Sequence, residues 1–209
     1  MTMPAPAGVL CGTAPGRAEW LGNHTDYNDG LVLGIGLDVG TVVRATKRPD
    51  RVLRMEAQDL GQSFEVSIEA LHPVASGSWA NYVIGVAAGF VARGAQTGGL
   101  DLTISSTVPI GAGLSSSAAL ECATGRVLQQ AWGTDFDELE LARIGQEAEH
   151  NFAGVCYGLY QRPVGRRLLA WAGGTGVPPV MIRKHGRDAR APSFCRGPKA
   201  KGRWYYSIS

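Results

Sequence analysis

The chain has 209 residues, of which 44% are hydrophobic and 18% are charged, and these are ordinary values for a globular protein. We find no signal-peptide pattern, no apolar run of membrane-spanning length and no C-x-x-C pair among the four cysteines. We therefore expect a cytoplasmic protein with free thiols, no membrane partner and no zinc site. The net charge of +2 conceals a division, because residues 1–161 carry 9 Lys/Arg and 17 Asp/Glu whereas residues 162–209 carry 11 Lys/Arg and 1 Asp.

A dense polar segment lies near the N-terminus, at residues 14–30. Its side chains can donate and accept several hydrogen bonds, and they include Arg17, His24, Asp26, Tyr27 and Asn28. The apolar run from Leu31 to Leu37 follows and predicts a buried strand. Planar and charged side chains at fixed positions can bind several hydroxyl groups at once, so the segment predicts recognition of a small polyol. The alternative is a solvated surface loop.

Residues 32–151 alternate between strand and helix patterns. Period-two alternation and β-branched residues predict strands, whereas apolar residues three and four apart predict helices. We expect strands at 32–48, 52–55, 63–68 and 100–106, with a hairpin turn at 59–61, and helices at 79–93, 115–132 and from 135 to about 151. Asp135 is predicted to cap the last of these helices, with Glu138 completing a capping box.

Val108 to Ala119 has the composition of a phosphate-binding loop. Gly111 and Gly113 lack a Cβ atom, so the backbone there can adopt positive φ and approach a ligand closely. Ser115 to Ser117 follow and lead into a helix, whose first N–H groups and dipole favour an anion. The loop does not end in G-K-[ST], which excludes a Walker A motif. The alternative is a Gly/Ser turn that caps an ordinary helix.

Together these motifs resemble those of galactokinases, which are members of the GHMP kinase superfamily. Residues 16–28 are similar to the galactokinase sugar signature, Pro109 to Ala119 to the superfamily's ATP loop, and Glu147 to Val155 to the start of the next galactokinase motif. The resemblance covers residues 8–160 and implies an α+β fold. This would be the N-terminal half of a GHMP kinase, a mixed sheet with helices like domain 2 of ribosomal protein S5. We expect this domain at 8–160 and an irregular basic tail at 161–209.

The resemblance implies ATP-dependent phosphorylation of galactose at its anomeric hydroxyl, with ATP and Mg²⁺ as cofactors. The ATP-binding residues would be Gly111, Ala112, Gly113, Leu114, Ser115, Ser116 and Ser117. Ser117 and Glu149 would bind Mg²⁺, since a hydroxyl and a carboxylate suit this oxygen-preferring ion. The sugar-binding residues would be Asn23, His24, Thr25, Asp26 and Tyr27. Arg17 would be catalytic, stabilising charge near the transferred phosphoryl group. The alternatives are a solvated helix face for Glu149 and a structural ion pair for Arg17.

Two departures from the galactokinase pattern change this expectation. Asn23 stands where the family has Glu, so the substrate is expected to be galactose or a related sugar. Gly158 to Gln161 reads Gly-Leu-Tyr-Gln where the family has Gly-x-x-Asp-Gln, and the Asp of that element is the catalytic carboxylate. Family members are longer, and the resemblance ends before their second half-domain. We therefore expect a truncated galactokinase that is inactive in this form.

The basic tail at 161–209 is rich in Pro, Gly, Lys and Arg and has little hydrophobic periodicity, which predicts loop or disorder. Its sequence looks like out-of-frame translation after the kinase-like part. One alternative function for the chain is a non-catalytic relative that binds sugar and ATP. A second is nucleic-acid binding through the tail, with Trp204, Tyr205 and Tyr206 stacking on bases, although the tail matches no known binding motif.

Overall fold

The computed structural model of the chain describes residues 8–21, 32–154 and 180–182. These ranges include the ATP-loop motif and Glu149. The sugar-binding residues expected at 23–27 and the Gly158–Gln161 element lie outside them, as does most of the basic tail. Among the described residues, no helix is both long enough and apolar enough to cross a membrane.

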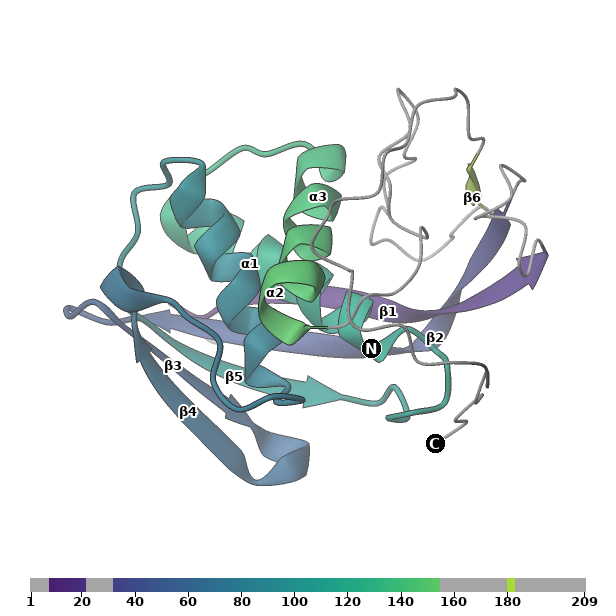
Figure 1. Cartoon of the computed structure of the whole chain (residues 1–209), viewed down its shortest axis with the longest axis horizontal. Coiled ribbons are helices and arrows are strands. Elements are labelled where there is room, and N and C mark those ends of the chain that lie inside the picture. Colours follow the sequence, from purple (N-terminus) through teal and green to yellow (C-terminus); the bar gives the residue numbers. More distant parts are fainter. Residues whose placement is uncertain (1–7, 22–31, 155–179, 183–209) are drawn as a thin grey trace, which may run out of the picture.

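A mixed sheet forms the base of the molecule (Figure 1). Its strands run in the order β1-β2-β5-β3-β4, and their bounds are β1 Leu10–Leu21, β2 Val32–Lys47, β3 Val52–Ala57, β4 Gln62–Ser67 and β5 Leu100–Ser106. The pair β3–β5 is parallel and the other pairs on this path are antiparallel. A short strand, β6 (Val180–Ile182), pairs with β2 at residues 32–34.

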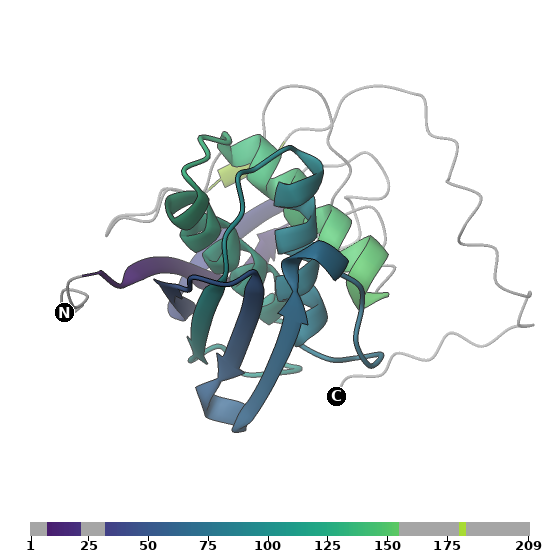
Figure 2. The ribbon, with the colours of Figure 1, turned by 90° about the vertical axis from the view of Figure 1, so that its left-hand side faces the viewer.

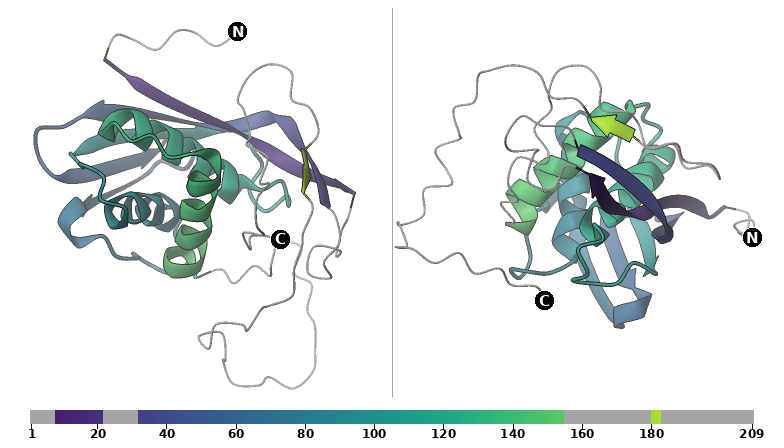
Figure 3. Two further views of the ribbon diagram at one scale, coloured as in Figure 1. Left: turned by 90° about the horizontal axis from the view of Figure 1, so that it is seen from above. Right: turned by 90° about the vertical axis from the view of Figure 1, so that its right-hand side faces the viewer.

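Three helices cover one face of this sheet, as Figures 1 and 3 show from two directions. They are α1 (Ala80–Ala92), α2 (Ser116–Trp132) and α3 (Glu138–Ala148), and α3 continues into a π-helical turn, η4 (Glu149–Ala153). Short 3-10 turns, η2 (Gln58–Leu60) and η3 (Ile68–Ala70), flank β4. The β3–β4 hairpin is the far edge of the sheet (Figure 2).

Burial follows the predicted alternation. Leu100, Leu102 and Ile104 of β5 are buried, whereas Asp101 and Thr103 between them are only half-buried. A strand turns successive side chains to opposite faces, so the buried set lies under the helices and joins one hydrophobic core. The α+β class and the predicted strands and helices of residues 32–132 are therefore confirmed, with boundaries that differ by at most two residues.

Aromatic contacts and two glycines determine how the helices pack. The Phe90 ring meets the rings of Trp132 and Phe136 edge-to-face, at centroid distances of 5.7 and 5.1 Å. Between α1 and α3, a Cβ atom on Gly85 would lie 2.6 Å from the Cβ of Ala148, and one on Gly89 would lie 2.8 Å from Ile144. Glycine at these two positions therefore allows α1 and α3 to approach closely.

The sequence analysis missed one strand and misplaced one helix cap. Residues 10–21 form the edge strand β1, for which no strand was predicted, and Arg17 of the polar segment lies in it. The cap of α3 is Asp137, whose Oδ1 accepts from the Glu140 backbone N–H at 2.7 Å, and not Asp135. Phe136 explains the shift, because its ring packs on Phe90 and its carbonyl oxygen accepts from Gln129 Nε2 at 3.0 Å. These contacts keep residue 136 in the connection before the helix.

Replacing Asp137 by Ala should lower the free energy of unfolding by about 1 kcal/mol, because the variant loses the side-chain acceptor for an orphan N–H at the start of α3. Asp135→Ala is the matched control: Asp135 is exposed and two residues away, so its replacement should change stability little. Urea unfolding of the two variants checks this. A larger loss of stability in Asp135→Ala than in Asp137→Ala would indicate that Asp135 caps α3.

Candidate functional site

The candidate site begins in the loop that joins β5 to α2. Gly111 and Gly113 have φ of +74° and +70°, as predicted from their lack of a Cβ, and both are exposed. Ser115 has φ of +57° and is the non-glycine residue with positive φ in the described ranges. Helix α2 starts at Ser116, and its N-cap residue Ser115 makes no side-chain capping bond. The first N–H groups of α2 are therefore not occupied by a capping side chain, which is the arrangement that binds anions at helix N-termini.

Both ends of this loop are held by the sheet. At its start, the Gly40 N–H donates to Thr107 Oγ1 and the Thr107 N–H donates to the Gly40 carbonyl oxygen, each at 2.9 Å. At its end, the Arg17 N–H of β1 donates to the Leu114 carbonyl oxygen at 3.0 Å. The exposed glycines lie between these attachments. The loop therefore combines a fixed base with an open tip.

Ser117 and Glu149 meet at the base of the loop. The Ser117 Oγ, in the first turn of α2, donates to Glu149 Oε1 at 3.1 Å. Glu149 is 3% exposed, which rules out the alternative of a solvated helix face. A hydroxyl and a carboxylate close together fit Mg²⁺, which prefers oxygen and is usually held by one or two carboxylates, waters and substrate phosphates. Within the described residues no group of three or more His, Cys, Asp or Glu is placed to hold a metal by itself.

Sequence reasoning missed Glu121. It lies one turn after Ser117 on α2 and is 5% exposed, and its Oε1 has no hydrogen-bond partner among the described residues. Burial raises the pKa of Glu121 well above its usual value, and the nearby charge of Glu149 raises it further. The i, i+4 spacing from Ser117 was the signal in the sequence, because residues at that spacing share a helix face.

The predicted catalytic residue, Arg17, is exposed on β1. Its side chain lies along Gly34 of β2, where a Cβ atom would come 3.0 Å from the Arg17 Cδ. Within residues 8–21 and 32–154 the structure gives Arg17 no ion pair, so the structural ion pair weighed for it is not made there. Arg17 therefore holds the end of the loop through its own backbone N–H, while its side chain lies along Gly34 of β2.

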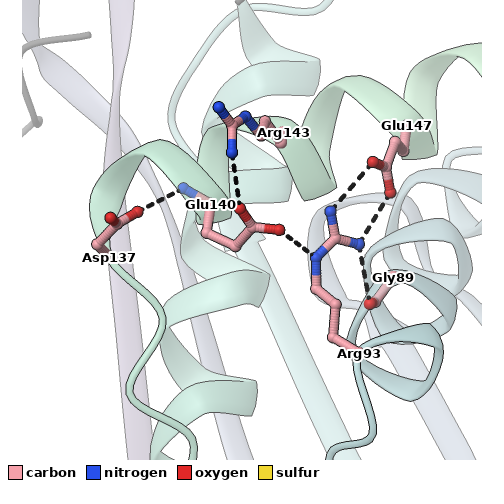
Figure 4. A network of polar contacts seen from close by, with 6 residues as sticks. All are labelled: Gly89, Arg93, Asp137, Glu140, Arg143 and Glu147. Atoms are coloured by element: carbon pink, nitrogen blue, oxygen red, sulfur yellow. Dashed lines mark hydrogen bonds and ion pairs between the residues drawn. The ribbon is translucent and has the colours of Figure 1, made fainter. Parts of the chain in front are cut away.

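An ionic network holds α3, the helix that leads into Glu149 (Figure 4). Arg93, just after α1, donates to Glu140 through Nε and to both carboxylate oxygens of Glu147 at 2.9 and 3.0 Å. Arg143 also donates to Glu140, at 3.1 Å. The two acids lie seven residues apart on one side of α3, so a single guanidinium spans two turns of the helix.

Comparisons with known proteins agree with this arrangement. Residues 81–160 match the model of the GHMP kinases N terminal domain, and residues 5–47 match the galactokinase galactose-binding signature. The chain is similar to Lactococcus lactis galactokinase, solved in complex with galactose: 31% identity and a TM-score of 0.68, with 74% of this chain and 41% of that one covered.

This chain contains the N-terminal domain of the GHMP kinases, of the galactokinase type. More distant structures share the fold of the domain. They include Methanococcus jannaschii mevalonate kinase (18% identity, TM-score 0.62, 71% of this chain and 49% of that one). Another is a D-glycero-D-manno-heptose 1-phosphate kinase from Bacteriodes thetaiotaomicron (19% identity, TM-score 0.61, 73% and 51%). The chain spans about half or less of the length of these proteins.

The ionic network predicts how the stability of the domain depends on pH. The hydrogen bond from Arg93 holds the pKa of Glu140 below its usual value of 4.5. The unfolded chain therefore takes up this proton at a higher pH than the folded chain does. The stabilisation is present above pH 4.5 and is lost as the pH falls through the pKa of the folded state. Glu140→Gln should flatten the acid limb of the stability profile.

Urea unfolding from about pH 7 down to about pH 3 measures this dependence. Glu56→Gln is the control, because Glu56 is exposed on β3 and forms none of the ion pairs in the described part of the chain. A wild-type acid limb as flat as that of Glu140→Gln would contradict a role for the network in stability.

Proposed function

We propose that this chain binds ATP with Mg²⁺ and galactose or a related sugar, as the N-terminal half of an ATP-dependent kinase acting on the anomeric hydroxyl. The observation that carries the proposal is the contact between Ser117 Oγ and Glu149 Oε1, placed where an uncapped helix start follows the glycine loop. The strand whose backbone holds this loop leads directly into residues 22–31, which lie within the matched galactose-binding signature.

The residues divide by task. The backbone N–H groups of Gly111 to Ser117 would hold the triphosphate, because positive φ at the glycines and an uncapped helix start present donors to an anion. Ser117 and Glu149 would hold Mg²⁺, which when bound neutralises phosphate charge. Asn23, His24, Thr25, Asp26 and Tyr27 would bind sugar hydroxyls. The exposed Arg17 guanidinium would stabilise charge near the transferred phosphoryl group.

Ser117→Ala should weaken the affinity for Mg²⁺-AMP-PNP about tenfold, which corresponds to about 1.4 kcal/mol, because it removes one proposed ligand of the ion. Affinity for AMP-PNP in the absence of Mg²⁺ should change little. Ser63→Ala, on the exposed edge strand β4, is the control. Isothermal titration calorimetry with and without Mg²⁺ separates the two effects. Equal losses under both conditions would remove Ser117 from the metal site.

Asp26→Ala should abolish detectable galactose binding while affinity for the nucleotide is retained, because a site built for hydroxyls loses much of its affinity when a polar partner is removed. Asp29→Ala, in the same segment, is the matched control and should bind both ligands. Calorimetric titration of the two variants with each ligand gives the comparison. Loss of nucleotide affinity in Asp26→Ala would indicate a structural role for Asp26.

A non-catalytic binding role is the second candidate, and one observation in the sequence favours it. Gly158 to Gln161 lacks the Asp that the galactokinase pattern places in this element. We expect galactose-dependent ADP release by the 209-residue chain to be undetectable while both ligands bind, since positioning without the carboxylate leaves at most a residual rate. An ADP-release assay with and without galactose measures this. Sustained galactose-dependent turnover would reject the binding role and favour the kinase.

A further inference from the structure

Gly16 lies where the pairing of β1 with β2 changes register. Pro15 pairs with Gly40 and Arg17 pairs with Gly36. Between these two pairs β1 advances by two residues and β2 by four. Gly16, between these two pairs, is buried. The N–H of the next residue, Arg17, donates to the carbonyl oxygen of Leu114, in the loop that joins β5 to α2. The register change thus coincides with the attachment of the loop to the sheet.

The backbone of the loop rests directly on Gly16. A Cβ atom at this position would lie 2.9 Å from the Leu114 carbonyl oxygen and 3.3 Å from both Cγ atoms of Val108. The Leu114 oxygen belongs to the main chain and is held by the hydrogen bond from Arg17, so it cannot rotate away as a flexible side chain would. Any side chain at position 16 would therefore push the end of the loop off β1.

The loop also needs this support. Ser115, immediately after Leu114, has φ of +57°, a left-handed conformation that is unfavourable for a residue with a Cβ and persists only where surrounding contacts hold it. Ser117, with its contact to Glu149, follows two residues later. The attachment at Leu114 therefore fixes the turn through which the chain enters α2 and orients the first turn of that helix.

We propose that Gly16 is a positioning residue for the nucleotide site. By lacking a side chain it lets β1 hold Leu114, and so keeps Ser115 to Ser117 in a fixed position relative to this strand, which lies within the matched galactose-binding signature. The inference rests on the proposed function, because only that function assigns nucleotide binding to this loop. Gly16 itself is not proposed to contact the nucleotide or the sugar.

The test compares Gly16→Ala with Ala14→Gly. Ala14 is buried on the same strand and belongs to the hydrophobic core, so Ala14→Gly destabilises the domain without adding an atom beside the loop. Gly16→Ala should speed hydrogen exchange of the amides in residues 108–117 and weaken the affinity for Mg²⁺-AMP-PNP about tenfold. Ala14→Gly should lower the Tm with neither loop-specific effect.

A second variant covers the case in which Gly16→Ala does not fold. Val108→Ala removes the methyl groups that pack on Gly16 without placing an atom against the loop backbone. It should raise the exchange of residues 110–117 in the same direction. Unchanged exchange in this variant and in any folded Gly16→Ala would overturn the inference, as would equal loop exchange in Ala14→Gly.

The nucleotide measurement separates this inference from the proposed function. If the wild-type chain binds Mg²⁺-AMP-PNP and folded Gly16→Ala binds it equally well, the positioning role alone is wrong. If the wild-type chain fails to bind the nucleotide, the proposed function is overturned, and with it the positioning role. Faster loop exchange together with weaker nucleotide binding, in Gly16→Ala but not in Ala14→Gly, supports both.

Discussion

The close packing of α2 on β1 is the constraint on which the candidate site depends. A Cβ atom on Gly12 would lie 2.1 Å from the Ala123 carbonyl oxygen and 2.9 Å from the Val127 nitrogen, so the helix backbone rests on the strand with no side chain between them. The N-terminal end of α2 carries Ser117, and the loop before it is hydrogen-bonded to the same strand. One strand thus sets the distance of the whole helix from the sheet and the place where that helix begins.

The second support of the site comes from α1. Through Gly85 and Gly89 this helix contacts α3, and through Arg93 it holds two acids of α3. Because α3 leads without a break into the π turn that begins at Glu149, the carboxylate has a position set by the helix pair and not by a flexible loop. Catalytic and binding groups need such rigid support to be held in place. Neither α1 nor its contacts with α3 include a residue of the proposed ligand set.

The sequence predicted well those features that depend on periodicity. The alternation in residues 100–106 describes one buried face of a strand. The apolar spacing in residues 79–93 marks a helix that is buried around most of its surface. The sequence was a poor guide to secondary structure where polar residues lie in a strand. The edge strand β1 contains Arg17 and Glu19 among small residues, so its pattern is that of a loop, and only pairing with β2 shows it to be a strand.

The site was predicted in part, for similar reasons. The glycine loop and the Ser117–Glu149 pair follow from local motifs, although their contact joins residues 32 positions apart that only the fold brings together. Glu121 was missed because its i, i+4 spacing from Ser117 indicates a shared helix face but does not show that the acid is buried. The cap at Asp137 was missed because two Asp residues stand on either side of Phe136, and tertiary packing of that ring decided between them. The comparisons match the same motifs and confirm the family that these motifs indicated, and the chain spans 41% of the galactokinase it resembles.

Gly12, Gly16, Gly85 and Gly89, where a Cβ atom would meet a neighbouring helix or loop, occur as two pairs with the same spacing. Gly12 and Gly16 are four apart in a strand, where residues an even number apart face the same side, and both turn that side toward α2 and its loop. Gly85 and Gly89 are four apart in a helix, where the same spacing also gives a shared side, here toward α3. Substitution at any of these positions would be selected against for steric reasons, although none contacts a proposed ligand. In an alignment of relatives, invariant glycines at this spacing would therefore record how the layers pack, and their conservation should not be taken as a sign of catalysis.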